Sequence, residues 1–252
     1  MGSLPVASII VREVSLNRAD YETQHGATSR DARDAGVASV CLAKDPLWIH
    51  LQECAHSQVD DMDALFANYT RVPEGGKGRE SWYRKGQGIK IIAAELDNVD
   101  HMLASDTKPF IKIVWEKQGI RSATANFHNE NEGTAIQRAQ LLDVMEAIRD
   151  FGKAHSSVLK NTMACGDTNR KKSSADLWGW DVWKNGMLHA AEEINTDRHT
   201  FNGWVESTPG RPIDVFAVRR GAHVIKAQNV LLGGENVSDH NLQYIKRELV
   251  AQ

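Results

Sequence analysis

The side chains best suited to chemistry in this sequence are carboxylates, an amide and a histidine placed at the edges of short apolar runs. They are Glu53, Asp167, Asn169, Asp214, Asp239 and His240. Strand ends are rigid positions from which a scaffold can direct side chains into one cleft, and we predict that these residues occupy such ends. Hard divalent cations prefer oxygen ligands, usually one or two carboxylates with water and substrate phosphate oxygens. The pattern therefore favours metal-assisted chemistry, with a histidine oriented by a carboxylate for acid–base work.

Each of these residues also has a purely structural interpretation. Glu53 precedes a predicted helix and is able to cap it. Asp167 and Asn169 are residue types that turns favour. Asp214 fits an exposed strand start, and His240 fits a core histidine whose hydrogen bonds are satisfied. Taken one at a time, the residues leave both interpretations open.

Four short segments, in order along the chain, resemble motifs of the endonuclease/exonuclease/phosphatase superfamily. They are Gln52-Glu53, Gly166-Asp167-Thr168-Asn169, Pro212-Ile213-Asp214-Val215-Phe216 and Ser238-Asp239-His240, which resemble the QE, GDxN, IDxxF and SDH motifs. No single motif is specific, but the ordered set, each at a predicted strand end, points to this group. The resemblance extends from about Asn17 to His240, nearly the whole chain. It implies a fold similar to that of pancreatic deoxyribonuclease, apurinic endonucleases, sphingomyelinases and inositol-phosphate phosphatases.

The resemblance also implies a role for each matched residue. Glu53 would be the principal ligand of a Mg²⁺ or Mn²⁺ ion, with Asp239 near the metal. Asp167 would contact or deprotonate the attacking water, and Asn169 would orient the scissile phosphate. His240, paired with Asp214, would complete the acid–base or phosphate-stabilising machinery.

Two further segments resemble the superfamily less closely. Ser15-Leu16-Asn17 is similar to a first-strand motif that ends in an asparagine, which makes Asn17 a candidate metal-site residue. Ala125-Asn126-Phe127-His128 is similar to a strand whose end contacts the phosphate, which makes His128 a candidate catalytic residue. Both segments depart from the usual spelling of these motifs.

Apolar patterning predicts the elements that position these residues. We expect strands at Ala7–Val14, Leu47–Leu51, Ile89–Ala94, Phe110–Trp115, Ala123–Phe127, Ile213–Val218 and His223–Val230, and helices at Arg30–Ala43, Asp60–Ala67 and Gln137–Phe151. Strands mixed with helices, without regular alternation, favour an α+β layered fold. The resemblance implies a four-layer α/β sandwich, with two mixed β-sheets packed face to face and helices outside, as one domain over residues 1–252.

Composition limits the cellular setting. The 252 residues carry a formal net charge of −3, so the chain as a whole is no polycation. Its three cysteines are unclustered, which argues against a disulfide scaffold and favours a reducing cytoplasm. No apolar run approaches the roughly 20 residues of a membrane helix, and the N-terminus lacks the pattern of a signal peptide. We therefore expect a cytoplasmic protein with no membrane partner.

A basic and aromatic segment suggests the substrate. Arg170, Lys171 and Lys172 follow the GDTN segment directly, and Trp178 and Trp180 come soon after. Cations that hold the backbone, with aromatic rings on which bases stack, suit nucleic acid. Arg79–Lys85 repeats this combination on another predicted loop. The alternative is that the tryptophans form a small core of their own.

These observations predict a metal-dependent nuclease that acts by water attack on a phosphodiester. A phosphomonoesterase or a lipid or small-molecule phosphodiesterase on the same fold is the first alternative, and a catalytically silent nucleic-acid-binding relative is the second. The sequence leaves open DNA or RNA, endo or exo action, one metal or two, sequence preference and oligomeric state.

Overall fold

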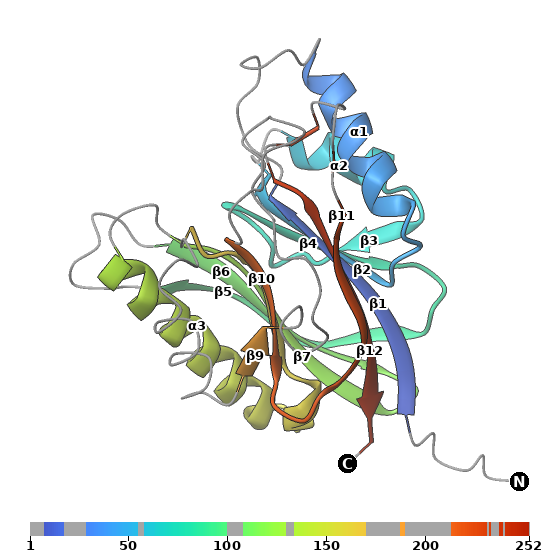
Figure 1. Ribbon diagram of the computed structural model, residues 1–252. Helices are drawn as coiled ribbons and strands as arrows, with labels where there is room; N and C mark the ends of the chain where they lie inside the picture. Colours follow the sequence, from blue (N-terminus) through green and yellow to red (C-terminus); the bar gives the residue numbers. More distant parts are fainter. Residues whose placement is uncertain are drawn as a thin grey trace, which may run out of the picture.

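The computed structural model describes residues 8–17, 29–54, 58–99, 108–129, 134–169, 187–189, 213–230, 232, 237–238 and 240–251. These residues build two six-stranded sheets that pack face to face, with helices on the outer faces (Figure 1). Each sheet contains one parallel strand pair among antiparallel ones. The predicted α+β sandwich of two mixed sheets is confirmed.

The first sheet joins the two ends of the chain. Its strand order is β11-β12-β1-β2-β4-β3. The strands are β1 (Ser8–Asn17), β2 (Trp48–Cys54), β3 (Tyr69–Arg71), β4 (Gly78–Arg84), β11 (His223–Val230) and β12 (Leu242–Val250). β1 runs parallel to β2 and antiparallel to β12, so the N-terminal and C-terminal strands are neighbours.

The second sheet is drawn from the middle of the chain. Its order is β5-β6-β7-β8-β10-β9. The strands are β5 (Ile89–Val99), β6 (Lys108–Lys117), β7 (Ile120–His128), β8 (Met163–Asp167), β9 (Met187–His189) and β10 (Asp214–Arg219). β7 and β8 are parallel, so their carboxyl ends meet at one edge of the sandwich.

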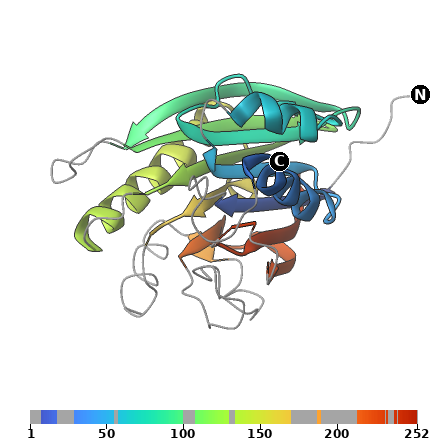
Figure 2. The same cartoon turned by 90° about the horizontal axis from the view of Figure 1, so that it is seen from above.

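Helices cover the outer face of each sheet. Helix α1 (Arg30–Leu42) begins at Ser29, whose hydroxyl accepts a hydrogen bond from Ala32 N–H, and it packs on the first sheet with α2 (Val59–Leu65). Helix α3 (Thr134–Ala154) lies on the second sheet through the predicted apolar stripe, which buries Leu141, Met145 and Ile148. Seen from above, α3 and α1 lie on opposite sides of the two sheets (Figure 2). No described helix has the length and apolar character needed to cross a membrane.

The interior between the sheets changes from apolar to polar along the strands. The inward residues of β1 illustrate this, because Ile9 and Val11 belong to a buried apolar cluster whereas Glu13 and Ser15 are buried polar groups. The polar half continues to the carboxyl end of β1. The gradient therefore leads from a packed hydrophobic base to the edge where the candidate residues gather.

A buried ion pair stands in the middle of this gradient. Arg247 donates to Glu13 at 2.9 Å, to Asn161 O at 2.9 Å and to Ser122 Oγ at 3.1 Å. His50 completes the group, since Nδ1 lies 2.9 Å from Ser81 Oγ and Nε2 lies 3.4 Å from Glu13 Oε2. Burial raises the pKa of Glu13, but Arg247 and His50 lower it more, so the net pKa lies below its ordinary value. Glu13 is therefore a carboxylate with its charge balanced.

Among the strands that the sequence did not predict, which include β3 and β9, the longest are β4 and β12. The segment predicted as a loop around Trp82 is strand β4, and Trp82 is fully buried against Phe66, with its indole N–H donating to Asp63. The final strand β12 was not predicted. In both strands the inward positions include polar residues, Ser81 in β4 and Arg247 in β12. A polar interior hides the alternation of apolar and polar residues on which strand prediction depends.

Candidate active site

Strand register brings the candidate residues to one edge of the sandwich. His128 at the end of β7 is paired with Asp167 at the end of the parallel strand β8. Asp214 begins the antiparallel strand β10 directly opposite Asp167. Glu53 reaches the same place from β2 of the other sheet, where its carboxylate oxygen lies 3.5 Å from His128 Nε2. Both sheets therefore contribute to the site.

At the site, the backbone adopts conformations that residues other than glycine rarely adopt. Glu53 (φ 53°) and Asn169 (φ 53°) are in the left-handed region, and Glu53 lies where the pairing of β2 with β4 shifts register. Such residues cost of order 1–3 kcal/mol each and occur preferentially at functional sites. Gly166 (φ 147°) passes so close to β7 that a Cβ there would lie 1.9 Å from Phe127 O. Only glycine fits at that position of the GDTN segment.

Asp214 and His240 form a buried hydrogen-bonded pair. Asp214 Oδ2 lies 2.8 Å from His240 Nδ1, and both residues are almost fully buried. The main chain of the pair is also held, since His240 N–H donates to Ser238 Oγ at 3.0 Å and Gln243 Nε2 donates to Asp214 O at 3.0 Å. The other ring nitrogen, Nε2, faces Asp167 Oδ2 at 3.7 Å. The pairing predicted between Asp214 and His240 is thus present in the structure.

Asn169 links Asp167 to His128. Its backbone N–H donates to Asp167 Oδ1 at 2.6 Å, while its amide Nδ2 donates to Asn129 O at 2.8 Å and lies 2.9 Å from His128 Nε2. Because an amide nitrogen only donates, His128 Nε2 is the acceptor and the imidazole is neutral. Burial lowers the pKa of His128 to about 3, against the opposing effect of Glu53, which agrees with a neutral ring.

The carboxylate oxygens and imidazole nitrogens gathered at the site are suitable ligands for a divalent cation. The acceptor nitrogen of His128 faces two carboxylate oxygens, Glu53 Oε1 at 3.5 Å and Asp167 Oδ2 at 3.7 Å. A positive ion stabilises carboxylate oxygens that converge in this way. Asp167, Asp214 and His240 also each offer a ligand atom within 4.8 Å of the others. The Glu53 side chain is 26% exposed, so an ion bound to its carboxylate could also bind water molecules.

Sequence reasoning missed the site role of Arg79. Its guanidinium is almost buried, donates to His128 O at 3.1 Å and to Lys77 O, and its charge contributes to lowering the pKa of His128. Arg79 therefore joins the glycine-rich segment before β4 to the end of β7. The sequence analysis placed Arg79 in a basic and aromatic loop. Its position directly after Gly78 was the one local feature that could have indicated a role at the site.

Several predicted site residues are placed only in part. Asn17 ends β1 opposite Gln52, as the first-strand motif requires, but only its backbone is described. The predicted metal residue Asp239 lies outside the described residues. So do the predicted substrate-binding residues, which are Arg170, Lys171, Lys172, Trp178 and Trp180.

The structure also shows which of the purely structural roles considered for these residues are absent. Glu53 does not cap α2, whose first residue is Val59 and whose N-cap position is held by Gln58. Asp214 is buried, so it is not an exposed strand start. Asp167 and Asn169 do form the local turn that their residue types favour, and the same turn fixes the Asp167 carboxylate. For these two residues the two interpretations are compatible.

Comparison with known proteins identifies the fold. Neither a protein-family model nor a curated protein sequence matches the chain. Among solved structures, an endonuclease/exonuclease/phosphatase protein from Bacteroides vulgatus is 18% identical with a TM-score of 0.81, over 96% of this chain and 99% of that one. The mannosyl-6-phosphatase of Bacteroides thetaiotaomicron is 19% identical with a TM-score of 0.79, over 96% and 100%. The human nocturnin catalytic domain is 16% identical with a TM-score of 0.75, over 96% and 94%. The chain therefore has the fold of the endonuclease/exonuclease/phosphatase proteins.

Proposed function

We propose that this protein is a divalent-metal-dependent phosphoesterase. One observation carries the proposal, which is the convergence of His128, Asn169 and His240 on the Asp167 carboxylate, with the Glu53 carboxylate 3.5 Å from His128 Nε2. Carboxylates from different strands, a neutral imidazole and a carboxylate-bound imidazole are the groups that hydrolysis of a phosphate ester needs. A divalent ion held by Glu53, with Asn17 and Asp239 nearby, would neutralise negative charge on the phosphate.

The side chains of this chain have separate tasks in the proposed reaction. Asp167 orients the attacking water and accepts its proton, because its Oδ1 is fixed by Asn169 N–H and its Oδ2 faces the cleft histidines. Asp214 accepts a hydrogen bond from His240 Nδ1–H, and in the protonated ring Nε2–H would donate to the phosphoryl oxygen on which charge develops. Asn169 presents an amide N–H that a phosphate oxygen takes over from His128.

Within this class we propose that the substrate is a nucleic acid. The basic run Arg170–Lys172 follows Asn169 directly in sequence, and basic residues of this kind favour a polyanionic substrate. The likeness to the mannosyl-6-phosphatase favours a second candidate, hydrolysis of a sugar phosphate monoester. A catalytically silent relative is the least supported candidate, because Glu53, Asp167, Asn169 and His240 form an intact set.

The test is digestion of supercoiled plasmid, linear duplex and single-stranded oligonucleotides with Mg²⁺ or Mn²⁺, against EDTA. Mannose 6-phosphate is assayed in parallel by phosphate release. We expect metal-dependent cleavage that Asp167→Ala loses. The matched control is Asp150→Ala, which removes an exposed aspartate on α3 that pairs with its neighbour Arg149, and it should leave activity unchanged.

Each result has one meaning. Cleavage of nucleic acid that Asp167→Ala loses supports the nuclease. Phosphate release from the sugar phosphate without nucleic-acid cleavage would replace the nuclease assignment with that of a phosphomonoesterase. Two results together would contradict the proposal that the protein is a phosphoesterase. They are no activity of the folded protein on any phosphoester, and no rise in its melting temperature with Mg²⁺ or Mn²⁺. The metal-induced rise should disappear in Glu53→Gln, which tests the ligand assignment without an activity assay.

A further inference from the structure

A row of cationic side chains crosses the outer face of the first sheet, at the end away from the candidate active site. Lys226 of β11 is paired with Lys246 of β12, and Lys246 is paired with Arg12 of β1. The line continues through Leu47, whose N–H donates to Arg12 O at 2.7 Å and whose carbonyl accepts from Arg84 N–H at 3.0 Å. Four of the five positions in this line are therefore basic. We call these four residues the cationic row.

The cationic row has a cost for the folded protein. Like charges directly opposite each other on neighbouring strands are destabilising. Asp45 lies between Arg12 and Arg84 and pairs with both, but it offsets only that end of the row. At the other end, the side-chain ammonium groups of Lys226 and Lys246 make no hydrogen bond or ion pair with any described part of the chain. A partner with negative charge would relieve this repulsion.

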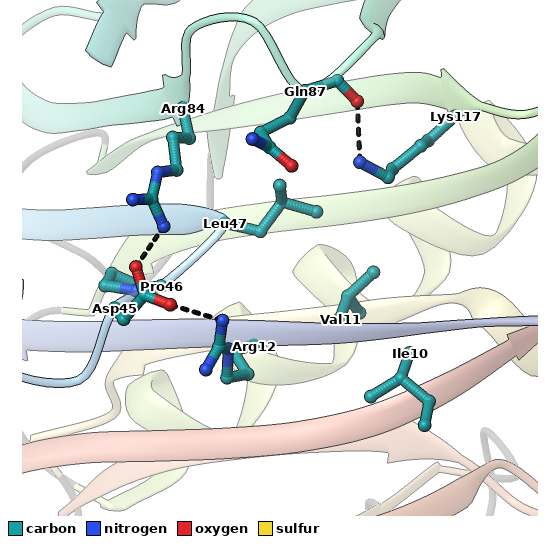
Figure 3. Close-up of a pocket in the computed structure, with 9 residues that line it drawn as sticks. All are labelled: Ile10, Val11, Arg12, Asp45, Pro46, Leu47, Arg84, Gln87 and Lys117. Atoms are coloured by element: carbon teal, nitrogen blue, oxygen red, sulfur yellow. Dashed lines mark hydrogen bonds and ion pairs between the residues drawn. The ribbon is translucent and has the colours of Figure 1, made fainter. Parts of the chain in front are cut away.

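The row opens into a pocket that adds another cation. The pocket lies beside the Arg12–Asp45–Arg84 cluster, and Lys117 stands at its edge with Nζ donating to Gln87 O at 2.6 Å (Figure 3). Apolar side chains of Val11 and Leu47 line it as well. The positive surface thus extends from β11 to the end of β6, although the chain as a whole carries a net charge of −3.

We propose that the cationic row binds the phosphodiester backbone of a nucleic acid. Neighbouring strands lie about 4.8 Å apart, so the five-strand line is about 19 Å long. One nucleic-acid strand advances about 3.4 Å along the helix axis per phosphate, so the row spans the length of about five to six nucleotides. Such contacts position a nucleic acid without distinguishing its sequence. The choice of nucleic acid, among polyanions, rests on the proposed function.

The shape of the positive surface favours a linear partner over a membrane. Glu248, two residues beyond Lys246 on β12, pairs with Ser8 and His223 and makes the neighbouring line acidic. The cationic surface is therefore one residue wide on this side, which matches a single backbone strand better than a field of lipid headgroups. The exposed isoleucines Ile10 (58% exposed) and Ile225 (39% exposed) give a membrane some apolar area, so vesicles belong in the test.

The row lies within reach of the candidate active site along one strand. Arg12 and Asn17 are both in β1, and five residues of strand extend about 17 Å. A nucleic acid held at the row can therefore remain tethered while another part of it occupies the site. The expected consequence is tighter binding and longer retention of polymeric substrates, with no effect on small phosphoesters.

The test is fluorescence anisotropy with a labelled 20-nucleotide single strand and a 20-base-pair duplex in EDTA, over a series of salt concentrations. Lys226→Glu/Lys246→Glu should weaken binding about 10- to 100-fold at moderate salt, and it should lower the slope of log affinity against log salt by about 2. Lys226→Gln/Lys246→Gln should show a smaller loss in the same direction. The matched control, Lys90→Glu/Lys153→Glu, changes exposed lysines elsewhere and should bind as the wild type does.

Several outcomes would overturn the proposal. Unchanged affinity and salt slope in a folded double variant is one, and no oligonucleotide binding by the wild type is another. Binding of phosphatidylserine-containing vesicles that the variant loses, with oligonucleotide binding intact, would assign the row to a membrane. The binding assay needs no catalysis, so it separates this proposal from the nuclease. Hydrolysis of bis(p-nitrophenyl) phosphate, if the protein catalyses it, should be equal in wild type and variant.

Discussion

Two polar clusters, built from the same residue types and lying in the same sandwich, differ in how their charges are balanced. In the interior cluster around Glu13, Arg247 lies 2.8 Å from the carboxylate, and His50, Ser122 and Asn161 complete the hydrogen bonds. At the strand ends, the carboxylates of Glu53 and Asp167 lie 3.5 and 3.7 Å from Nε2 of a neutral His128. A guanidinium cation balances the interior carboxylate, whereas an uncharged imidazole stands beside the two carboxylates at the strand ends.

This difference separates a structural group from a functional one. A buried polar network is stable when every donor meets an acceptor, and it then fixes how two sheets pack. Carboxylates gathered around a neutral imidazole are oxygen ligands that a hard divalent cation prefers. Residue type alone does not distinguish the two cases, because each cluster contains carboxylates and histidines. Only the partner of each oxygen distinguishes them.

The largest effect, on turnover, is expected from changing the Asp214–His240 pair. Asp214→Asn keeps the shape of the side chain but removes the carboxylate that orients His240. Turnover should fall about 10²- to 10⁴-fold, because the imidazole loses the group that fixes its tautomer. Initial rates on whichever substrate the cleavage and phosphate-release assays identify measure this. A variant that folds normally and keeps activity within threefold of the wild type would contradict the assigned role.

Disrupting the interior cluster should reduce stability and leave the chemistry intact. Arg247→Met leaves Glu13 buried without its cation, and we expect a loss of about 3–5 kcal/mol in the free energy of unfolding. Because Arg247 and His50 hold the pKa of Glu13 below its ordinary value, their contribution is present at neutral pH and lost as pH falls through that lowered pKa. The difference from the wild type should therefore shrink on acidification, as denaturant titrations would show.

The double variant Glu13→Gln/Arg247→Met is the control for this interpretation. It removes both charges, so it should recover part of the lost stability. An equal or greater loss in the double variant would mean that packing, rather than the unpaired charge, causes the effect. Activity per folded molecule should be unchanged in either variant.

The smallest effect concerns Glu80, which is intermediate between the two clusters. It is buried in β4, and its nearest cation is Arg71 at 3.6 Å. Burial raises the pKa of Glu80 to about 7, from an ordinary 4.5, although Arg71 opposes the rise. Because the folded state then binds more protons, the stability that Glu80 contributes is full below pH 4.5 and is lost as pH rises to about 7.

Glu80→Gln should remove this pH dependence. We expect it to stabilise the protein by about 1–3 kcal/mol at pH 8 and to have little effect at pH 4.5, where the wild-type carboxyl is protonated. Urea unfolding at both pH values measures the difference. Equal wild-type and variant stability at pH 8 would show that Arg71 balances the charge of Glu80 after all.

The sequence predicted those elements that pack against apolar layers. The apolar stripe of α3 and the apolar strand β6 could be identified because each packs against a dry, apolar layer. β4 and β12 were missed because their inward positions hold residues such as Ser81 and Arg247. A strand that faces a polar interior lacks the alternation that a single sequence reveals.

The candidate site was predictable through its motifs and not through its geometry. The ordered segments around Glu53, Asp167, Asp214 and His240 named the residues that the described structure brings together. The contact of Asn169 with His128 and the approach of Arg79 to His128 O had no signal of their own in the sequence. Both depend on the pairing of strands that are distant in the chain.

The sequence by itself determined which residue types stand at strand ends and where α1 and α3 form. Those are local properties of a chain. The tertiary structure alone decided that Glu13 is neutralised by Arg247, that Glu53 faces a neutral His128, and that Lys226, Lys246 and Arg12 form one line. The physical reason is that charge balance depends on distances between strands, which are set only when the two sheets close on each other.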